Sequence, residues 1–189
     1  MGSEMCIRDR DVDKAKSMLE DAGVSGLKLK LGYMSSDAVQ SAQALLIQEQ
    51  LKEVGVTVEL AGGDGTAIAN AMKDPDNEYD MYLGGYIMGI DPDTFSSLFE
   101  NDGAYNYMHY SGYDTIDQLF EEGRSELDES ARKETYAKLQ AAVQDTGAFY
   151  PIISNNKILV VNNRIQGVED AGLVPVYTFE DTSSLKIAE

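Results

Sequence analysis

The chain has little of what most metal centres and nucleophilic enzymes are built from. Its 189 residues include a single cysteine, Cys6, and a single histidine, His109. One cysteine excludes an internal disulfide or a cysteine-rich metal site, and one histidine excludes a multi-histidine metal site within this chain. The sequence also lacks the His-Glu-x-x-His, Gly-x-Ser-x-Gly and phosphate-cradling glycine motifs. These absences predict a protein that is not an enzyme and that holds no cofactor.

Cationic residues and long hydrophobic runs are also scarce. The 15 lysines and arginines face 33 aspartates and glutamates, which gives a formal net charge of −18. Nucleic acid and anionic membrane surfaces would repel such a field, so neither is an expected partner. No run of about 18 apolar residues occurs, so no segment is expected to span a membrane. Between Lys73 and Arg124 there is no lysine or arginine. This stretch is therefore not expected to bind a carboxylate or phosphate group of a ligand.

Residues 1–10, MGSEMCIRDR, differ from the rest of the chain. They contain no apolar run of signal-peptide length and no periodicity, and they join abruptly to a helix start at Asp11. We predict that they are a non-native tag or artefact residues. Cys6 has no hydrophobic segment before it, so we do not expect it to be a lipoprotein cysteine.

The spacing of apolar residues from Asp11 onward changes repeatedly between helical and strand periods. Three helices are expected at 11–22, 35–53 and 64–72, and two strands at 27–31 and 56–60. The residues of the second helix that are predicted to face inward are Ala38, Ala42, Leu45, Leu46 and Leu51. A strand, a crossover helix and a strand of these lengths form a right-handed βαβ unit with parallel strands. The predicted fold class is therefore α/β.

The stretch 79–99 combines a strand, a glycine break and an acidic turn. Residues 79–83 alternate as a half-buried strand does, and the two glycines that follow remove side chains where a ligand could approach. Asp91 is a predicted N-cap and Pro92 suits the first helical position. Asp91 and Asp93 could also be a carboxylate pair for acid–base chemistry, and this alternative is left open here.

The next loop is rich in tyrosine. Tyr105, Tyr107, Tyr110 and Tyr113 surround His109 among turn residues. Two interpretations are open: the tyrosines cover the domain surface, or they form a stacking and hydrogen-bonding wall of a pocket. In the rest of the chain, helices are predicted at 115–123 and 130–145, and strands at 149–153 and 158–161. A tail with short β-like pieces follows at 166–189.

Taken in order, several of these segments resemble one family. They are DVDKAKSMLEDAG, LKLKLGY, ALLIQEQLKEVGVTVEL, YDMYLGGYIMGIDPDTFSSLF, YDTIDQLFEEGRSELDESARKETYAKLQ and FYPIISNNKILVVNNRIQGV. The series resembles the C-terminal half of the family 5 extracellular solute-binding proteins, which are the peptide, oligopeptide and nickel-type substrate-binding subunits of bacterial ABC importers. The resemblance implies a periplasmic-binding-protein-like fold with a mixed sheet, in which two lobes close on a ligand and the N-terminal lobe is missing here.

The resemblance also implies domains and site residues. Residues 11–156 would form the ligand-binding lobe and residues 157–189 a segment that returns toward the missing first lobe. The family often has tryptophan at the position of Tyr86, where it lines the ligand cavity. Peptide binders of the family place an aspartate before the Asp-Pro to hold the ligand amine, but here that loop is one residue shorter and has no acid before Asp91. The expected ligand-binding residues are Tyr86, Ile87, Met88, Gly89, Asp91, Tyr105, Tyr107 and His109.

The function that the resemblance implies is capture of a small peptide for an ABC permease, outside the cytoplasm, at the periplasm or the cell surface. Two other functions are kept: a nickel-type metal-binding protein that uses His109, and a carboxylate-dependent hydrolase that uses Asp91 or Asp93. A lobe without its partner also exposes surfaces built for contact. We therefore expect self-association through the predicted strand 158–161, or weak ligand binding because half of the pocket is absent.

Overall fold

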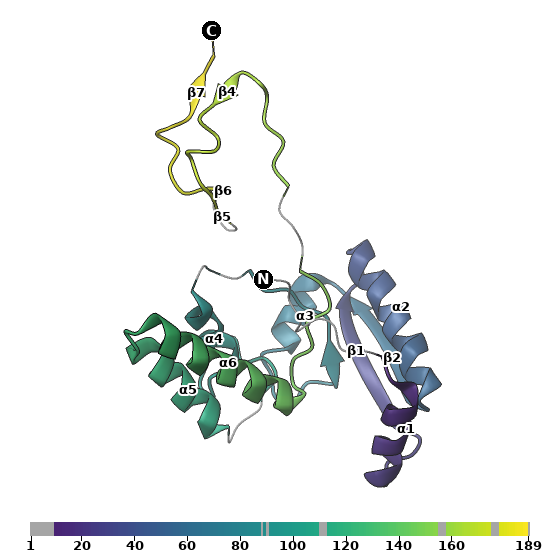
Figure 1. The fold of residues 1–189 in the computed structure, drawn as a ribbon. Helices are drawn as coiled ribbons and strands as arrows, with labels where there is room; N and C mark the ends of the chain where they lie inside the picture. The colour runs from purple at the N-terminus through teal and green to yellow at the C-terminus, as the bar shows by residue number, and fades with distance from the viewer. Residues whose placement is uncertain are drawn as a thin grey trace. The chain divides into compact units, whose positions relative to one another are not determined.

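The computed structural model describes residues 10–87, 89, 91–109, 113–154, 158–174 and 178–188. The chain divides into two compact units, and each is traced in Figure 1. Unit 1 consists of Met1–Gly85 and Tyr107–His109, and unit 2 consists of Tyr86–Asn106 and Tyr110–Glu189. The chain therefore passes from one unit to the other within the stretch 85–110. No described helix is both long and apolar enough to cross a membrane.

Unit 1 is a parallel sheet with helices. Its elements are α1 (Val12–Asp21), β1 (Lys28–Met34), α2 (Ala38–Glu53), β2 (Thr57–Gly63), α3 (Gly65–Ala71) and β3 (Met81–Tyr82). The strand order is β2-β1-β3, and β1 pairs in parallel with both neighbours. Figure 1 shows α2 lying along this sheet. The predicted βαβ unit is confirmed.

Aspartates start the helices of unit 1. The side chains of Asp11, Asp37 and Asp64 accept hydrogen bonds from backbone N–H groups of the first turns of α1, α2 and α3. These N–H groups have no partner within the helix, so each cap satisfies donors that would otherwise be unpaired. The helices consequently begin one to three residues later than the apolar spacing predicted.

The core of unit 1 shows which side of α2 faces the sheet. Its buried residues are Leu31, Ala44, Val56, Val58 and Leu83, and Ile47 and Leu51 pack against them. Of the residues predicted to face inward, only Leu51 does so; Ala38 and Ala42 are exposed, and Leu45 and Leu46 are 56% and 58% exposed.

The prediction for α2 was wrong because this helix has apolar residues on two sides, and helical spacing alone cannot select between them. The sheet contacts the side that carries Ala44 and Ile47. On the same side, Gln48 donates a hydrogen bond from Nε2 to the Val58 carbonyl at 2.7 Å. This bond to β2 fixes the rotation of the helix about its axis.

Unit 2 is built on a helical hairpin. A short 3₁₀ helix, η2 (Pro92–Phe95), leads into α4 (Ser96–Phe99), and α5 (Asp114–Ser125) packs against α6 (Glu129–Thr146). Ile116, Leu119, Phe120 and Leu139 are buried in this unit. The predicted helices at 115–123 and 130–145 are confirmed.

The strands predicted at 149–153 and 158–161 do not form among the described residues. Instead, two separate antiparallel pairs occur later in the chain: β4 (Ile165–Gln166) with β7 (Lys186–Ile187), and β5 (Leu173–Val174) with β6 (Thr178–Phe179). A strand requires a neighbour for its backbone N–H and C=O groups, and sequence periodicity does not reveal whether one is available. Within the described residues, the predicted mixed sheet does not occur, and the parallel and antiparallel strands form separate sheets.

Candidate functional site

The chain leaves β3 at its carboxyl end and reaches Tyr86 four residues later. The Tyr86 hydroxyl donates to the Thr94 carbonyl at 2.8 Å and lies 3.0 Å from Ser97 Oγ. Its ring stacks on Phe95 with centroids 5.9 Å apart, and 37% of the residue is exposed. Tyr86 is therefore an aromatic side chain fixed at its hydroxyl and on one face, with surface left for contact.

Asp91 has a structural role in the turn that follows. Its Oδ1 accepts a hydrogen bond from the Asp93 backbone N–H at 2.8 Å, as expected of the predicted N-cap of η2. Arg132 Nη2 lies 2.9 Å from Asp91 Oδ1 and 3.0 Å from Oδ2. The Asp93 N–H and the Arg132 guanidinium both favour the charged carboxylate, so they lower the pKa of Asp91 below its usual value. The N-cap prediction is confirmed.

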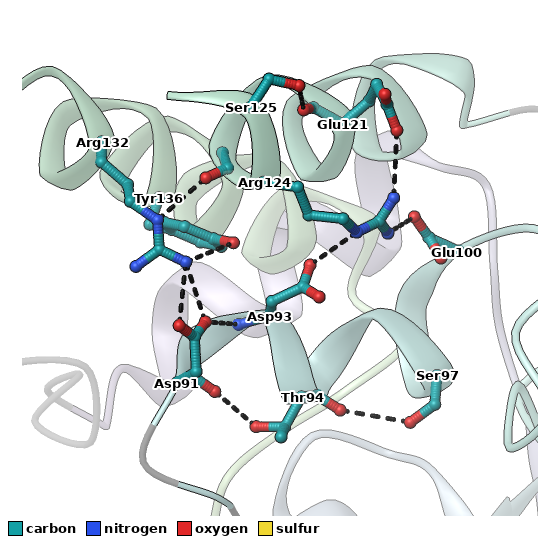
Figure 2. Close-up of polar contacts among 11 residues, drawn as sticks. Asp91, Asp93, Thr94, Ser97, Glu100, Glu121, Arg124, Ser125, Arg132 and Tyr136 are labelled. Atoms are coloured by element: carbon teal, nitrogen blue, oxygen red, sulfur yellow. Dashed lines mark hydrogen bonds and ion pairs between the residues drawn. The ribbon is translucent and has the colours of Figure 1, made fainter. Parts of the chain in front are cut away.

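Asp93 belongs to a second ion pair in the same unit. Arg124 Nε lies 2.9 Å from Asp93 Oδ1, and the same guanidinium also binds Glu100 and Glu121. Figure 2 shows that Arg124 and Arg132 extend from the helical hairpin toward η2. The hydrogen bond to Glu100, together with the other acids, raises the pKa of Arg124.

The structure therefore uses both carboxylates of the Asp91 and Asp93 pair for ion pairs with arginines. Sequence reasoning noted the lack of cations between Lys73 and Arg124, but it missed that Arg124 and Arg132, from the hairpin, supply the positive charges. Asp91 and Arg132 are 41 positions apart. No local spacing pattern indicates such a pair, so the sequence offered no signal for it.

Two more of the predicted site residues lie in the loop between Tyr86 and Asp91. Ile87 is 73% exposed. A Cβ added at Gly89 would lie 2.7 Å from Thr94 Cγ2, so the backbone approaches η2 closely here and favours glycine. Met88 lies outside the described residues.

The tyrosine loop is divided between the units. Tyr105 belongs to unit 2, where its backbone N–H donates to the Ser97 carbonyl at 2.8 Å. Tyr107 and His109 belong to unit 1. There, burial and the neighbouring Tyr107 raise the pKa of Tyr82 to about 12. Tyr110 lies outside the described residues.

His109 has a defined partner in unit 1. Its Nε2 lies 2.7 Å from the carbonyl of Met72, the residue that caps the C-terminus of α3. Its φ of 50° lies in the left-handed region, which is uncommon for a residue with a side chain. Among the described residues there is no group of three or more histidine, cysteine, aspartate or glutamate side chains placed to hold a metal ion.

The eight predicted site residues are therefore only partly brought together. Tyr86 and Asp91 are linked through Thr94, and Tyr86 and Tyr105 both bond to Ser97. The ligand-binding role of each of the eight residues stays a prediction.

Comparison with solved structures defines the class of protein. The chain is similar to the ABC transporter substrate-binding protein CtaP from Listeria monocytogenes, with 36% identity and a TM-score of 0.86, over 100% of this chain and 39% of that one. The fold is that of one part of a periplasmic-binding-protein-like molecule, as the sequence predicted.

The family follows from the sequence match. The model described as bacterial extracellular solute-binding proteins, family 5 Middle, matches residues 5–107, and the chain belongs to this family. Among its relatives is the peptide transport periplasmic protein SapA from Haemophilus influenzae, 26% identical over 82% of this chain and 28% of SapA. Another is the nickel-binding periplasmic protein from Escherichia coli, 22% identical over 93% of this chain and 36% of that protein.

The chain thus spans about a third of the length of these relatives. The family consists of extracellular solute-binding proteins rather than enzymes, and its members work with ABC permeases. The predicted family is confirmed.

Proposed function

We propose that this chain is the ligand-binding lobe of the substrate-binding component of a bacterial ABC importer, and that its ligand is a small peptide. The observation that carries the proposal is the fixed, partly exposed Tyr86 ring after the carboxyl end of β3, in a chain that belongs to a solute-binding family. An aromatic ring with a bonded hydroxyl offers a flat apolar face to side chains of varied sequence. The relative SapA, a peptide transport protein, supports the peptide as ligand class.

The state of Asp91 refines how a peptide would be held. Its carboxylate is bonded by Arg132 and by the Asp93 N–H, so it is not offered as an anchor for a peptide amine. Arg124 and Arg132 are likewise bonded to acids and are not offered to a peptide carboxylate. We infer that this part of the lobe contacts the ligand through neutral groups, and that peptides with blocked and free amino termini bind with similar affinity.

The segment 157–189 would extend toward the first lobe, as the resemblance implies. Its exposed apolar side chains support this role: Ile158 and Val160 are 84% and 90% exposed and form no strand. Ile152 and Ile153, just before it, are also exposed. Apolar residues in an extended segment gain most from strand partners. In the first lobe's absence we expect copies of the chain to associate through this segment.

Metal binding is the second candidate function, because a nickel-binding protein is among the relatives. It would use His109, whose Nε2 is bonded to the Met72 carbonyl in unit 1. A metal ion at Nε2 would require that hydrogen bond to break. The peptide function is therefore the one that these contacts favour.

The test is isothermal titration calorimetry on a longer protein, of the relatives' length, that carries this chain. It would be titrated with di- to hexapeptides, with their N-acetylated forms and with nickel. Tyr86→Ala is expected to weaken peptide binding by about tenfold, about 1.4 kcal/mol. The matched control is Tyr113→Ala, because Tyr113 is a tyrosine of similar exposure, 39% against 37%, elsewhere in unit 2.

Each result has a defined meaning. Peptide binding that Tyr86→Ala weakens and Tyr113→Ala does not would support the proposed site. Heat from nickel alone, abolished by His109→Ala, would replace the peptide function by metal binding. Equal losses in both tyrosine variants would show that Tyr86 has no special role.

A further inference from the structure

Arg132, on α6, is held on several sides at once. Its Nε donates to the Gly123 carbonyl at 2.9 Å, and its guanidinium carbon lies 4.8 Å from the centroid of the Tyr136 ring. These contacts join it to α5 and to the next turn of α6. With the guanidinium fixed in this way, Nη2 points at both oxygens of Asp91, as Figure 2 shows. A planar guanidinium anchored by one edge suits a carboxylate better than a mobile ammonium group.

A continuous series of hydrogen bonds leads from Asp91 to Tyr86. The Asp91 carbonyl accepts from Thr94 Oγ1 at 2.6 Å and from the Thr94 backbone N–H at 3.1 Å. The Thr94 carbonyl in turn accepts from the Tyr86 hydroxyl. Both ends of the loop 86–91 are therefore attached to the same turn of η2.

Arg124 braces the other end of that turn. It binds Asp93, inside η2, and Glu100, which follows α4. The two arginines thus hold the η2–α4 segment from the helical hairpin at two points. The segment is short, so its position depends on such contacts more than on its own helical hydrogen bonds.

We propose that Arg132 is a positioning residue, which through Asp91 and Thr94 holds the Tyr86 ring in place for ligand binding. That Tyr86 binds ligand rests on the proposed function. The Nε and Nη2 donors of Arg132 are directed at Gly123, Asp91 and Tyr136, so in this proposal Arg132 acts through Asp91 rather than by contact with the ligand.

The effect of Arg132 is expected to be local. The Asp91 side chain is 56% exposed and that of Arg132 is 30% exposed, and ion pairs at such exposure contribute little to global stability. The same contact nevertheless holds Asp91, the residue that caps η2. Loss of the ion pair should therefore free the loop without unfolding unit 2.

Hydrogen exchange measured by mass spectrometry on the 189-residue chain tests this directly and needs no ligand. Arg132→Met keeps the apolar stem and removes the guanidinium. We expect amide exchange in peptides that cover 86–95 to rise by about tenfold, while exchange in α5 and in the parallel sheet stays unchanged. Arg132→Lys, which keeps the charge but not the fork of donors, should give an intermediate rise.

The matched control is Lys133→Met, which removes a charge from the next position of α6. Lys133 is exposed and forms no salt bridge among the described residues. Its removal should leave exchange at 86–95 unchanged. The inference is overturned if Arg132→Met leaves that exchange within about twofold of the wild type. It is equally overturned if exchange rises by the same factor throughout unit 2, because Arg132 would then only stabilise the unit.

Peptide affinity in the longer protein supplies the second readout. Arg132→Met should weaken binding about tenfold when Tyr86 is present and have no further effect in a Tyr86→Ala background. A full tenfold loss in that background would contradict a role through Tyr86. If no peptide binds the wild type, the proposed function fails, and the exchange experiment alone decides whether Arg132 positions the loop.

Discussion

The sheet of unit 1 and the turn at Asp91 in unit 2 are stabilised by different forces. In unit 1, two long parallel strands share a register along their whole length, and apolar residues such as Leu31 and Val58 are buried between sheet and helix. In unit 2, the turn at Asp91 is held by arginines of a helical hairpin, at partly exposed positions. Burial of apolar surface contributes far more per residue than exposed ion pairs do. Unit 1 should therefore lose stability through core substitutions, and the turn of unit 2 should lose order through charge substitutions.

The largest effect is expected in the core of unit 1. Leu31 is 2% exposed, and Leu31→Ala should lower the free energy of unfolding by about 2–5 kcal/mol, because it leaves a cavity. The matched control is Leu45→Ala, on the outer side of α2. This substitution should change the free energy of unfolding by at most about 0.5 kcal/mol. Urea denaturation followed by circular dichroism measures both. Equal losses in the two variants would show that the outer side of α2 is also covered.

A smaller effect is expected where α5 and α6 pack in unit 2. A Cβ added at Gly123 would lie 2.8 Å from the Tyr136 ring. Gly123→Ala should cost about 1–3 kcal/mol, because the ring, and Arg132 beside it, must shift. Gly85→Ala, at a position with nothing within 4 Å, is the control and should be nearly neutral. Thermal unfolding separates the two, and an unchanged melting temperature for Gly123→Ala would mean that the helices adjust freely.

Alkaline pH should weaken unit 1 through Tyr82. Burial raises the pKa of this phenol from its usual value of 10.0 to about 12, so the fold favours the neutral form. The stability that Tyr82 contributes is complete below pH 10 and is lost as the pH rises toward 12. Melting temperatures measured from pH 8 to 11.5 should therefore fall less steeply for Tyr82→Phe than for the wild type. Tyr150→Phe, at an exposed tyrosine, should keep the wild-type slope.

Acidic pH should have the smallest effect, through Asp91. The pKa of Asp91 is lowered in the fold, so its contribution to stability is complete above the usual value of 3.8 and is lost as the pH falls below that value. Because the pair is largely exposed, we expect a slight change in global stability and a clearer rise in amide exchange at 86–95. Asp91→Asn should already show that raised exchange at neutral pH. Exchange in this variant that matches the wild type at every pH would remove Asp91 from the network.

Most of unit 1 could be predicted from the sequence. The alternation of strand 27–31 and the helical spacing of 35–53 are local patterns, and a βαβ unit of these lengths has a defined hand. The N-cap role of Asp91 was also readable, because capping depends on residues only two or three positions apart. The side of α2 that faces the sheet was predicted wrongly, since two apolar sides carry the same local signal.

Less of the candidate site could be predicted from the sequence. Tyr86 was expected from the family resemblance, because the family often has tryptophan at this position, just after the strand and the two glycines. Its partners Thr94 and Ser97 were not predicted, nor was the bond between Asp91 and Arg132. The prediction of strands at 149–153 and 158–161 was wrong for a related reason. An apolar pattern does not indicate whether a neighbouring strand is available for pairing.

The sequence by itself determined the order and type of most helices and strands and, through the ordered series of segments, the family. These depend on short-range periodicity, turn residues and caps, which act within a few positions of the chain. The tertiary structure alone decided the buried side of α2, the division of the tyrosine loop between two units, and the partners of Asp91 and Asp93. Those outcomes depend on contacts between residues far apart in the sequence, such as Asp91 with Arg132, 41 positions away, which exist only once the chain has folded.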